Sequence, residues 1–160
     1  VIKLVDFGCS QLLADDDWDA NEDEGEFYSQ FGSIDHNLYA SGTESSNAIG
    51  KTPAYSPPEA FKTPAPPILP STDMWALGTI LFIMLTGLHP FDMSGRSTDE
   101  EIEELIVSSR SPPLNSPLTK HLSKSAIDLI QRLMSPNSED RMSAHELLEH
   151  PWVTGETAKK

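Results

Sequence analysis

The chain has 160 residues, of which 38% are apolar, so it is long enough for one domain with a substantial core. Its 25 acidic and 11 basic residues give a formal charge of −14, which argues against nucleic acid and anionic membranes as partners, because both are bound through Lys and Arg. A single cysteine excludes an internal disulfide and no segment reads as a signal peptide or membrane span, so we expect an intracellular protein, in the cytoplasm first with the nucleus as the alternative.

The N-terminal third combines a short strand with a long acidic loop. Residues 1 to 5 have the apolar, β-branched character of a buried strand, and Asp6-Phe7-Gly8 supplies a turn after it. Residues 9 to 51 follow without periodicity, and eleven acidic but no basic residues lie between Lys3 and Lys51. Such a segment does not bury enough apolar surface to offset chain entropy, so we predict a solvated loop. This loop either has a regulatory role or contributes only to solubility. Because the first residue is valine and not methionine, we expect further chain upstream, with processing of the N-terminus as the alternative.

The first predicted helix begins at Ser71. Its apolar side chains between Met74 and Leu85 cover every face, so we expect the helix to be surrounded by protein. Gly87 supplies the helix stop, and Pro90 prevents its continuation.

Three more helices are predicted further along. A capping box over residues 97–100 leads into a helix with Ile102, Leu105 and Ile106 on one face. The next helix carries its apolar residues at helical spacing, namely Leu122, Ala126, Leu129, Ile130 and Leu133. A second capping box over residues 143–146 opens the last helix, with Leu147 and Leu148 facing inward. The expected fold is mainly α.

Short motifs follow one another between residues 6 and 152. They are Asp6-Phe7-Gly8, Thr52 to Glu59, Asp73 to Gly78, Gly87 to Phe91, Pro136 to Arg141 and Leu148 to Trp152. In this order they resemble the C-terminal, helical lobe of a eukaryotic-type Ser/Thr protein kinase from its Asp-Phe-Gly motif onward, and the last is typical of calmodulin-kinase-like members. The resemblance implies a partial kinase domain over residues 1–153, with an acidic activation-loop insertion at 9–51 and a tail at 154–160.

The resemblance assigns catalytic roles to a few residues. Asp6 would ligate the Mg²⁺ that bridges the phosphates of ATP, and Gly8 would let the backbone turn away. The alternative for Asp6 is a turn that binds no metal. Thr52 would hydrogen-bond the catalytic aspartate and lysine, and Tyr55 would help to form the floor for the residue beside the phosphoacceptor. This segment favours Ser or Thr as the acceptor.

Other residues receive structural or regulatory roles. Glu59 and Arg141 resemble a buried ion pair that joins the activation segment to the base of the lobe, with unrelated surface charges as the alternative. Asp73 resembles the aspartate that holds the catalytic loop, which is absent from this sequence. Three hydroxyls lie where an upstream kinase would phosphorylate the activation loop, namely Thr43, Ser45 and Ser46.

The sequence departs from the family pattern at two positions. Lys51 stands at a usual glycine, with Gly50 one residue earlier, and Pro57 replaces an alanine. Cys9, directly after Asp-Phe-Gly, is either a packed side chain or a reactive thiol.

We therefore expect a Ser/Thr kinase fragment. In complete form it would transfer the γ-phosphoryl group of ATP to Ser or Thr of protein substrates, whereas the fragment alone would be inactive, because its sequence lacks the glycine-rich loop, the phosphate-pairing lysine and the catalytic loop. The rival reading is a noncatalytic pseudokinase or truncated lobe that binds protein partners through the helix near Ile102 and the acidic loop. A helical protein that matches by chance is a third reading.

Overall fold

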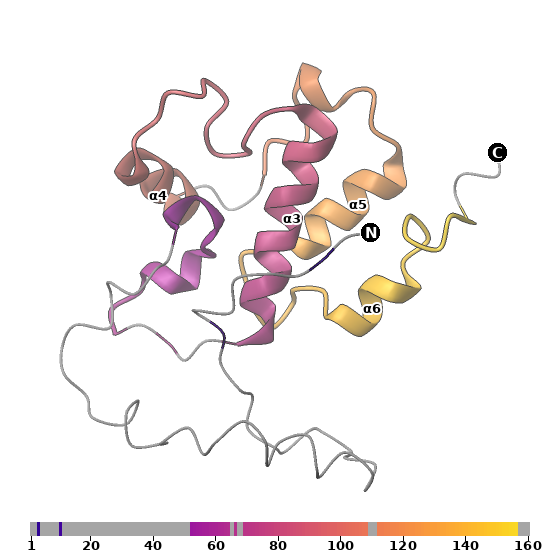
Figure 1. Ribbon diagram of the computed structural model, residues 1–160, viewed down its shortest axis with the longest axis horizontal. Helices are drawn as coiled ribbons and strands as arrows, with labels where there is room; N and C mark the ends of the chain where they lie inside the picture. Colours follow the sequence, from indigo (N-terminus) through magenta and orange to yellow (C-terminus); the bar gives the residue numbers. More distant parts are fainter. Residues whose placement is uncertain are drawn as a thin grey trace, which may run out of the picture. The chain divides into compact units, whose positions relative to one another are not determined.

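The computed structural model describes Lys3, Ser10 and residues 52–64, 66, 69–108 and 112–156. The chain divides into two units, Val1–Gly50 and Lys51–Lys160, and every named element belongs to the second. With the labels of Figure 1, the elements are η3 (Pro53–Tyr55), η4 (Pro58–Phe61), α3 (Pro70–Thr86), α4 (Asp99–Ser108), η5 (Pro117–Thr119), α5 (Lys124–Leu133) and α6 (Ala144–Glu149). The mainly α fold is confirmed. The strand predicted over residues 1–5 lies, except for Lys3, outside the described residues.

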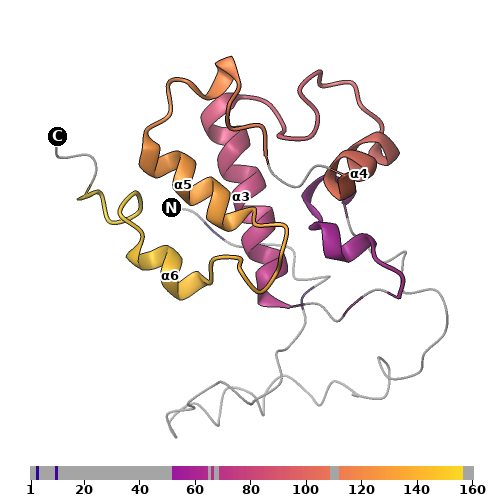
Figure 2. The same ribbon diagram turned by 180° about the vertical axis from the view of Figure 1, so that it is seen from behind.

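Helix α3 forms the centre of the second unit. It packs against α5 on one side and contacts η3 on the other, where α4 covers η3 and η4 (Figures 1 and 2). Side chains from all of these helices meet in one apolar cluster, which includes Trp75, Phe82, Ile106 and Ile130. The short segments before α3 are therefore held between α3 and α4, although they contain little regular structure themselves.

The ends of α3 follow from local chemistry. Pro70 occupies the first turn, where its missing N–H costs no hydrogen bond. Gly87 ends the helix in the left-handed region with φ 78°, and its N–H donates to the carbonyl of Ile83 at 2.8 Å. The predicted helix and its stop are confirmed. No helix within the described parts of the chain has the length and apolarity needed to cross a membrane.

The expectation that α3 is surrounded on every face is wrong. Met74, Trp75, Thr79 and Phe82 are buried, whereas Leu77 and Ile80 are exposed and Met84 is 77% exposed. The reason is geometric, because the described elements that pack on α3, mainly α5 and η3, leave the stripe formed by Leu77, Ile80 and Met84 uncovered. Apolar residues on every face thus predicted the helix correctly and its surroundings incorrectly.

Helix α4 starts one residue later than its predicted capping box implies. The Thr98 hydroxyl accepts the Glu101 N–H at 3.3 Å, and the Glu101 carboxylate accepts the Thr98 N–H at 2.9 Å. This reciprocal pair caps the helix in place of the predicted pair over residues 97–100. Ile102 and Ile106 are buried as expected, but Leu105 lies at the edge of the apolar face and is 42% exposed.

The last helix starts where the sequence predicts, whereas α5 starts after Leu122, which the sequence places within the helix. The Ser123 hydroxyl caps α5 by accepting the Ala126 N–H, and Leu122 precedes the helix as a partly buried side chain. Ser143 and Glu146 form the predicted capping box of α6. The inward orientation predicted for Leu148 is wrong, because α6 presents only Leu147 to the core and leaves Leu148 in solvent.

Candidate functional site

The segment from Thr52 to Phe61 consists of the two short helices η3 and η4 joined by extended residues. Pro53 and Pro58 each occupy the first turn, where a missing N–H is harmless. Pro57, which replaces the alanine of the kinase motif, is fully buried with φ −77° and ψ 163°. This φ lies within the range that the proline ring imposes, so the substitution suits the backbone at this point.

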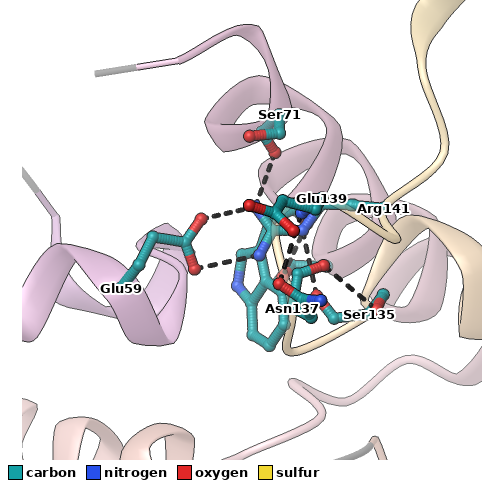
Figure 3. A network of polar contacts seen from close by, with 8 residues as sticks. Glu59, Ser71, Ser135, Asn137, Glu139 and Arg141 are labelled. Carbon is teal, nitrogen blue, oxygen red and sulfur yellow. Dashed lines mark hydrogen bonds and ion pairs between the residues drawn. The ribbon is translucent and has the colours of Figure 1, made fainter. Parts of the chain in front are cut away.

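Glu59 anchors the segment to Arg141. The guanidinium donates through Nη1 to Oε1 at 2.7 Å and through Nη2 to Oε2 at 2.9 Å (Figure 3). The side chains of Arg141 and Glu59 are 0% and 14% exposed. Two parallel charge-assisted bonds between a planar fork and a carboxylate are the strongest geometry open to such a pair. Of the two alternatives that the sequence leaves open, the structure contains the buried ion pair.

The remaining donors of Arg141 connect other parts of the lobe. Nη1 also donates to the carbonyl of Ser71 at 2.8 Å, and Nε donates to the carbonyl of Ser135 at 3.0 Å (Figure 3). The guanidinium carbon lies 5.2 Å from the centroid of the buried Trp75 ring, within the range of a cation–π contact. One arginine therefore joins η4, the first turn of α3 and the loop before α6.

His89 holds the other end of the segment. Its Nε2 lies 2.8 Å from the carbonyl oxygen of Ala54, and its Nδ1 accepts the N–H of Phe91 at 3.2 Å. The ring also meets the Tyr55 ring edge to face, with 6.0 Å between centroids. Because Nδ1 must be free of a proton to accept, Nε2 carries the proton and donates to Ala54. The neutral tautomer is thus fixed by its two partners.

The neutral form of His89 is also favoured electrostatically. Burial lowers the pKa of His89 below its ordinary value, and this outweighs the opposing effects of the Ala54 carbonyl and the Asp92 carboxylate. The sequence does not single out His89, which is one of the variable positions in Gly87-Leu88-His89-Pro90-Phe91. Its contact with Ala54 joins residues 35 positions apart, so no local pattern signals it.

The remaining described site residues lie in solvent. Thr52 is exposed, and its carbonyl accepts the Tyr55 N–H at 3.1 Å. Tyr55 is exposed beside His89. Asp73 is exposed in the first turn of α3, and its side chain forms no hydrogen bond or ion pair with other described residues. The structure therefore brings Glu59 and Arg141 together, places Tyr55 near them along the same segment, and leaves Asp73 without a partner.

Several sequence-predicted residues lie outside the described residues. These are Asp6, Gly8, Cys9, Thr43, Ser45, Ser46, Gly50 and Lys51. Within the described residues, no group of three or more His, Cys, Asp or Glu side chains is placed to hold a metal ion. The Mg²⁺ role predicted for Asp6 consequently depends on its sequence motif.

Comparison with known proteins agrees with this geometry. The protein kinase domain family matches residues 1–153. Serine/threonine-protein kinase PKZ1 of Phytophthora infestans is 38% identical over 104 residues, which cover 64% of this chain and 25% of that protein. The calcium and calcium/calmodulin-dependent serine/threonine-protein kinase of Oryza sativa subsp. japonica is 32% identical over 160 residues, or 99% of this chain and 24% of that protein.

The chain is also similar to a solved structure, titin kinase with its flanking domains. The match covers 68% of this chain and 19% of the titin chain, with 30% sequence identity and a TM-score of 0.57. The chain spans about a quarter of the length of the two curated relatives. The matching family, the order of the motifs and the helical lobe with its buried Glu59–Arg141 pair all agree, and the chain belongs to the protein kinase family.

Proposed function

We propose that the complete protein is a Ser/Thr kinase that transfers the γ-phosphoryl group of ATP to Ser or Thr hydroxyls of protein substrates. The observation that carries this proposal is the bidentate Glu59–Arg141 pair, which fixes the segment containing Thr52 and Tyr55 against the helical lobe. Protein kinases as a family use ATP and Mg²⁺ and act on proteins. A rigid segment suits such chemistry, since phosphoryl transfer depends chiefly on positioning and electrostatic stabilisation.

The proposed roles follow the family motif residue by residue. Asp6 would hold Mg²⁺, which when bound neutralises charge on the nucleotide phosphates. Thr52 would hydrogen-bond the catalytic aspartate and lysine, and its exposure leaves its hydroxyl open to such partners. Asp73, exposed and without a described partner, would accept backbone hydrogen bonds from the catalytic loop.

Tyr55 is proposed to form part of the floor on which the substrate chain lies. Support comes from its position, since its ring is exposed on one side and contacts His89 on the other. His89 in turn holds the Ala54 carbonyl and the Phe91 N–H, so the floor is fixed before a substrate arrives. Such preorganisation lowers the ordering cost of binding.

The proposal includes an upstream part of the kinase that this sequence lacks. The exposed apolar face of α3, formed by Leu77, Ile80 and Met84, is the surface that we expect this part to cover. The chain alone would then be inactive. We propose that an upstream kinase regulates the protein by phosphorylating Thr43, Ser45 or Ser46. We also propose that the protein is located in the cytoplasm or the nucleus.

The test is phosphotransfer by the full-length protein. We expect transfer of labelled phosphate from MgATP to Ser/Thr peptides, loss of transfer in Asp6→Asn, and retention in Asp19→Asn, which removes the same charge from the acidic loop. The 160-residue chain should show no transfer. A full-length protein that folds and binds partners but transfers no phosphate would instead establish the noncatalytic reading.

A further inference from the structure

An open cleft of about 360 Å³ lies between α4 and the loop that follows α3. Its walls are mainly apolar and consist of Pro90, Phe91, Met93, Ser94, Ser97, Leu105 and Pro113. Leu105 and Met93 are 42% and 37% exposed, so the chain places two large apolar side chains at the cleft without covering them. The volume falls at the lower end of the range for ligand pockets, roughly 300 to 1,000 Å³. The cleft therefore has room for an apolar side chain of a partner.

One wall of the cleft is held in place by Asp92. Its carboxylate accepts the Ser94 hydroxyl at 3.0 Å and the N–H groups of Arg96 and Ser97 at 3.2 and 3.3 Å. Desolvation raises the pKa of Asp92, but these hydrogen bonds outweigh it and lower the pKa to about 2. Asp92 is consequently charged at physiological pH, and the wall that carries Met93 is formed before any partner binds.

The charge beside the cleft is strongly negative. Helix α4 contains five acidic and no basic residues, and Arg96 is the one cation between Gly87 and Ser108. Glu101 lies one turn before Leu105 and therefore on the cleft side of the helix, whereas Glu103 lies on the opposite side. A partner seated against Leu105 would therefore lie on the side of α4 that carries the Glu101 carboxylate, whose Oε2 also accepts the Thr98 N–H.

The cleft also lies next to the proposed substrate segment. Helix α4 packs directly against η3 and η4, which contain Tyr55 and Glu59 (Figure 2). Anything held at the cleft is thus brought close to the segment on which a substrate is proposed to lie.

We propose that this cleft binds a basic segment of a protein partner, with one apolar side chain against Leu105 and flanking Lys or Arg side chains near Glu101. A second copy of this chain fits poorly, because two acidic α4 helices would repel each other. This inference goes beyond phosphotransfer, and its test needs no ATP.

The experiment measures binding of a labelled peptide to the full-length protein by fluorescence anisotropy. The probe carries one leucine between pairs of lysines, and a matched peptide carries serine in place of the leucine. We expect the leucine peptide to bind about fivefold more tightly. Leu105→Ala should remove this preference, and so should Met93→Ala on the opposite wall. Val107→Ala, on the same helix but away from the cleft, should preserve it.

The charge contribution has its own matched pair. Glu101→Gln keeps the helix cap, since glutamine replaces glutamate in a capping box, and should weaken binding about threefold. Glu103→Gln should leave binding unchanged. The acidic segment at 9–51 attracts any basic peptide, but it does so equally for both probes.

Three results would overturn the proposal. One is equal binding of the two peptides, and another is a leucine preference that survives both cleft variants. The third is a concentration-dependent dimer that Leu105→Ala abolishes, which would assign the cleft to a second copy.

Discussion

The two faces of α3 have similar composition but opposite surroundings. On one face, Trp75, Thr79 and Phe82 are fully buried, and Gly78 lies against α5. On the other, Leu77, Ile80 and Met84 are exposed, one turn after the unpaired Asp73. The difference shows that the described part of the lobe buries only one of the two faces of α3, although both faces carry large apolar residues. The buried face joins α3 to the rest of the lobe, whereas the exposed face is the surface that we propose the upstream part of the kinase covers.

The largest expected effect concerns the ion pair at the end of the buried face. Arg141→Gln leaves the carboxylate of Glu59 buried without its charge partner, so we expect a loss of about 3 to 5 kcal/mol in the free energy of unfolding, measured by urea denaturation. The control is Arg132→Gln, which removes the half-exposed pair between Arg132 and Glu146. A surface pair of this kind contributes about 0 to 1 kcal/mol. Equal losses of unfolding free energy in the two variants would mean that the Glu59–Arg141 pair stabilises the lobe no more than a surface pair does.

A smaller effect is expected where Gly78 of α3 lies against the C-terminal end of α5. A Cβ atom at Gly78 would lie 2.6 Å from Cγ of Met134 and 2.9 Å from Cβ of Leu133. Overpacking of this kind costs about 1 to 3 kcal/mol, and the better helix propensity of alanine offsets up to about 1 kcal/mol. We expect Gly78→Ala to lower the urea midpoint and Gly78→Ser to lower it further. Unchanged stability in both would contradict the close approach of the helices.

His89 allows a test by pH. His89→Gln should destabilise the protein by about 1 kcal/mol at about pH 7.5, because the paired imidazole bonds to Ala54 and Phe91 are lost or weakened. Since the folded-state pKa of His89 is lowered, its stabilising contribution is complete above the unfolded value of 6.5 and is lost as the pH falls through the folded value. The difference in unfolding free energy between the two proteins should therefore narrow towards about pH 5.5. If the difference in unfolding free energy instead widens as the pH falls, the folded protein favours the protonated His89 ring over the neutral one.

The sequence predicts this lobe well wherever the signal is local. Gly87 ends α3, and the Ser143–Glu146 capping box starts α6, because each depends on residues within one helical turn. The cap of α4 differs by one residue, since Ser97 and Thr98 compete as equivalent hydroxyls followed three positions later by glutamate.

What the sequence does not predict depends on contacts between distant residues. Leu148 has the spacing of an inward residue, yet none of the described elements covers it, and it remains exposed. His89 contributes to the site only because the chain folds back to place it against Ala54. The Glu59–Arg141 pair spans 82 positions and was predictable only through the resemblance to kinases, since spacing alone gives no reason to join the two residues.

The smallest effect expected in the 160-residue chain tests the exposed face of α3. Met84→Ala in the 160-residue chain should change the free energy of unfolding by less than about 0.5 kcal/mol, because a side chain that is 77% exposed loses little contact area on truncation. In the full-length protein the same substitution should cost about 2 to 5 kcal/mol if the upstream part of the kinase buries this face. Val107→Ala, on the exposed side of α4, provides a control that should have little effect in both proteins. A Met84→Ala effect that is equally small in the full-length protein would show that the exposed face stays open, and would remove the argument that α3 carries a surface for the upstream part.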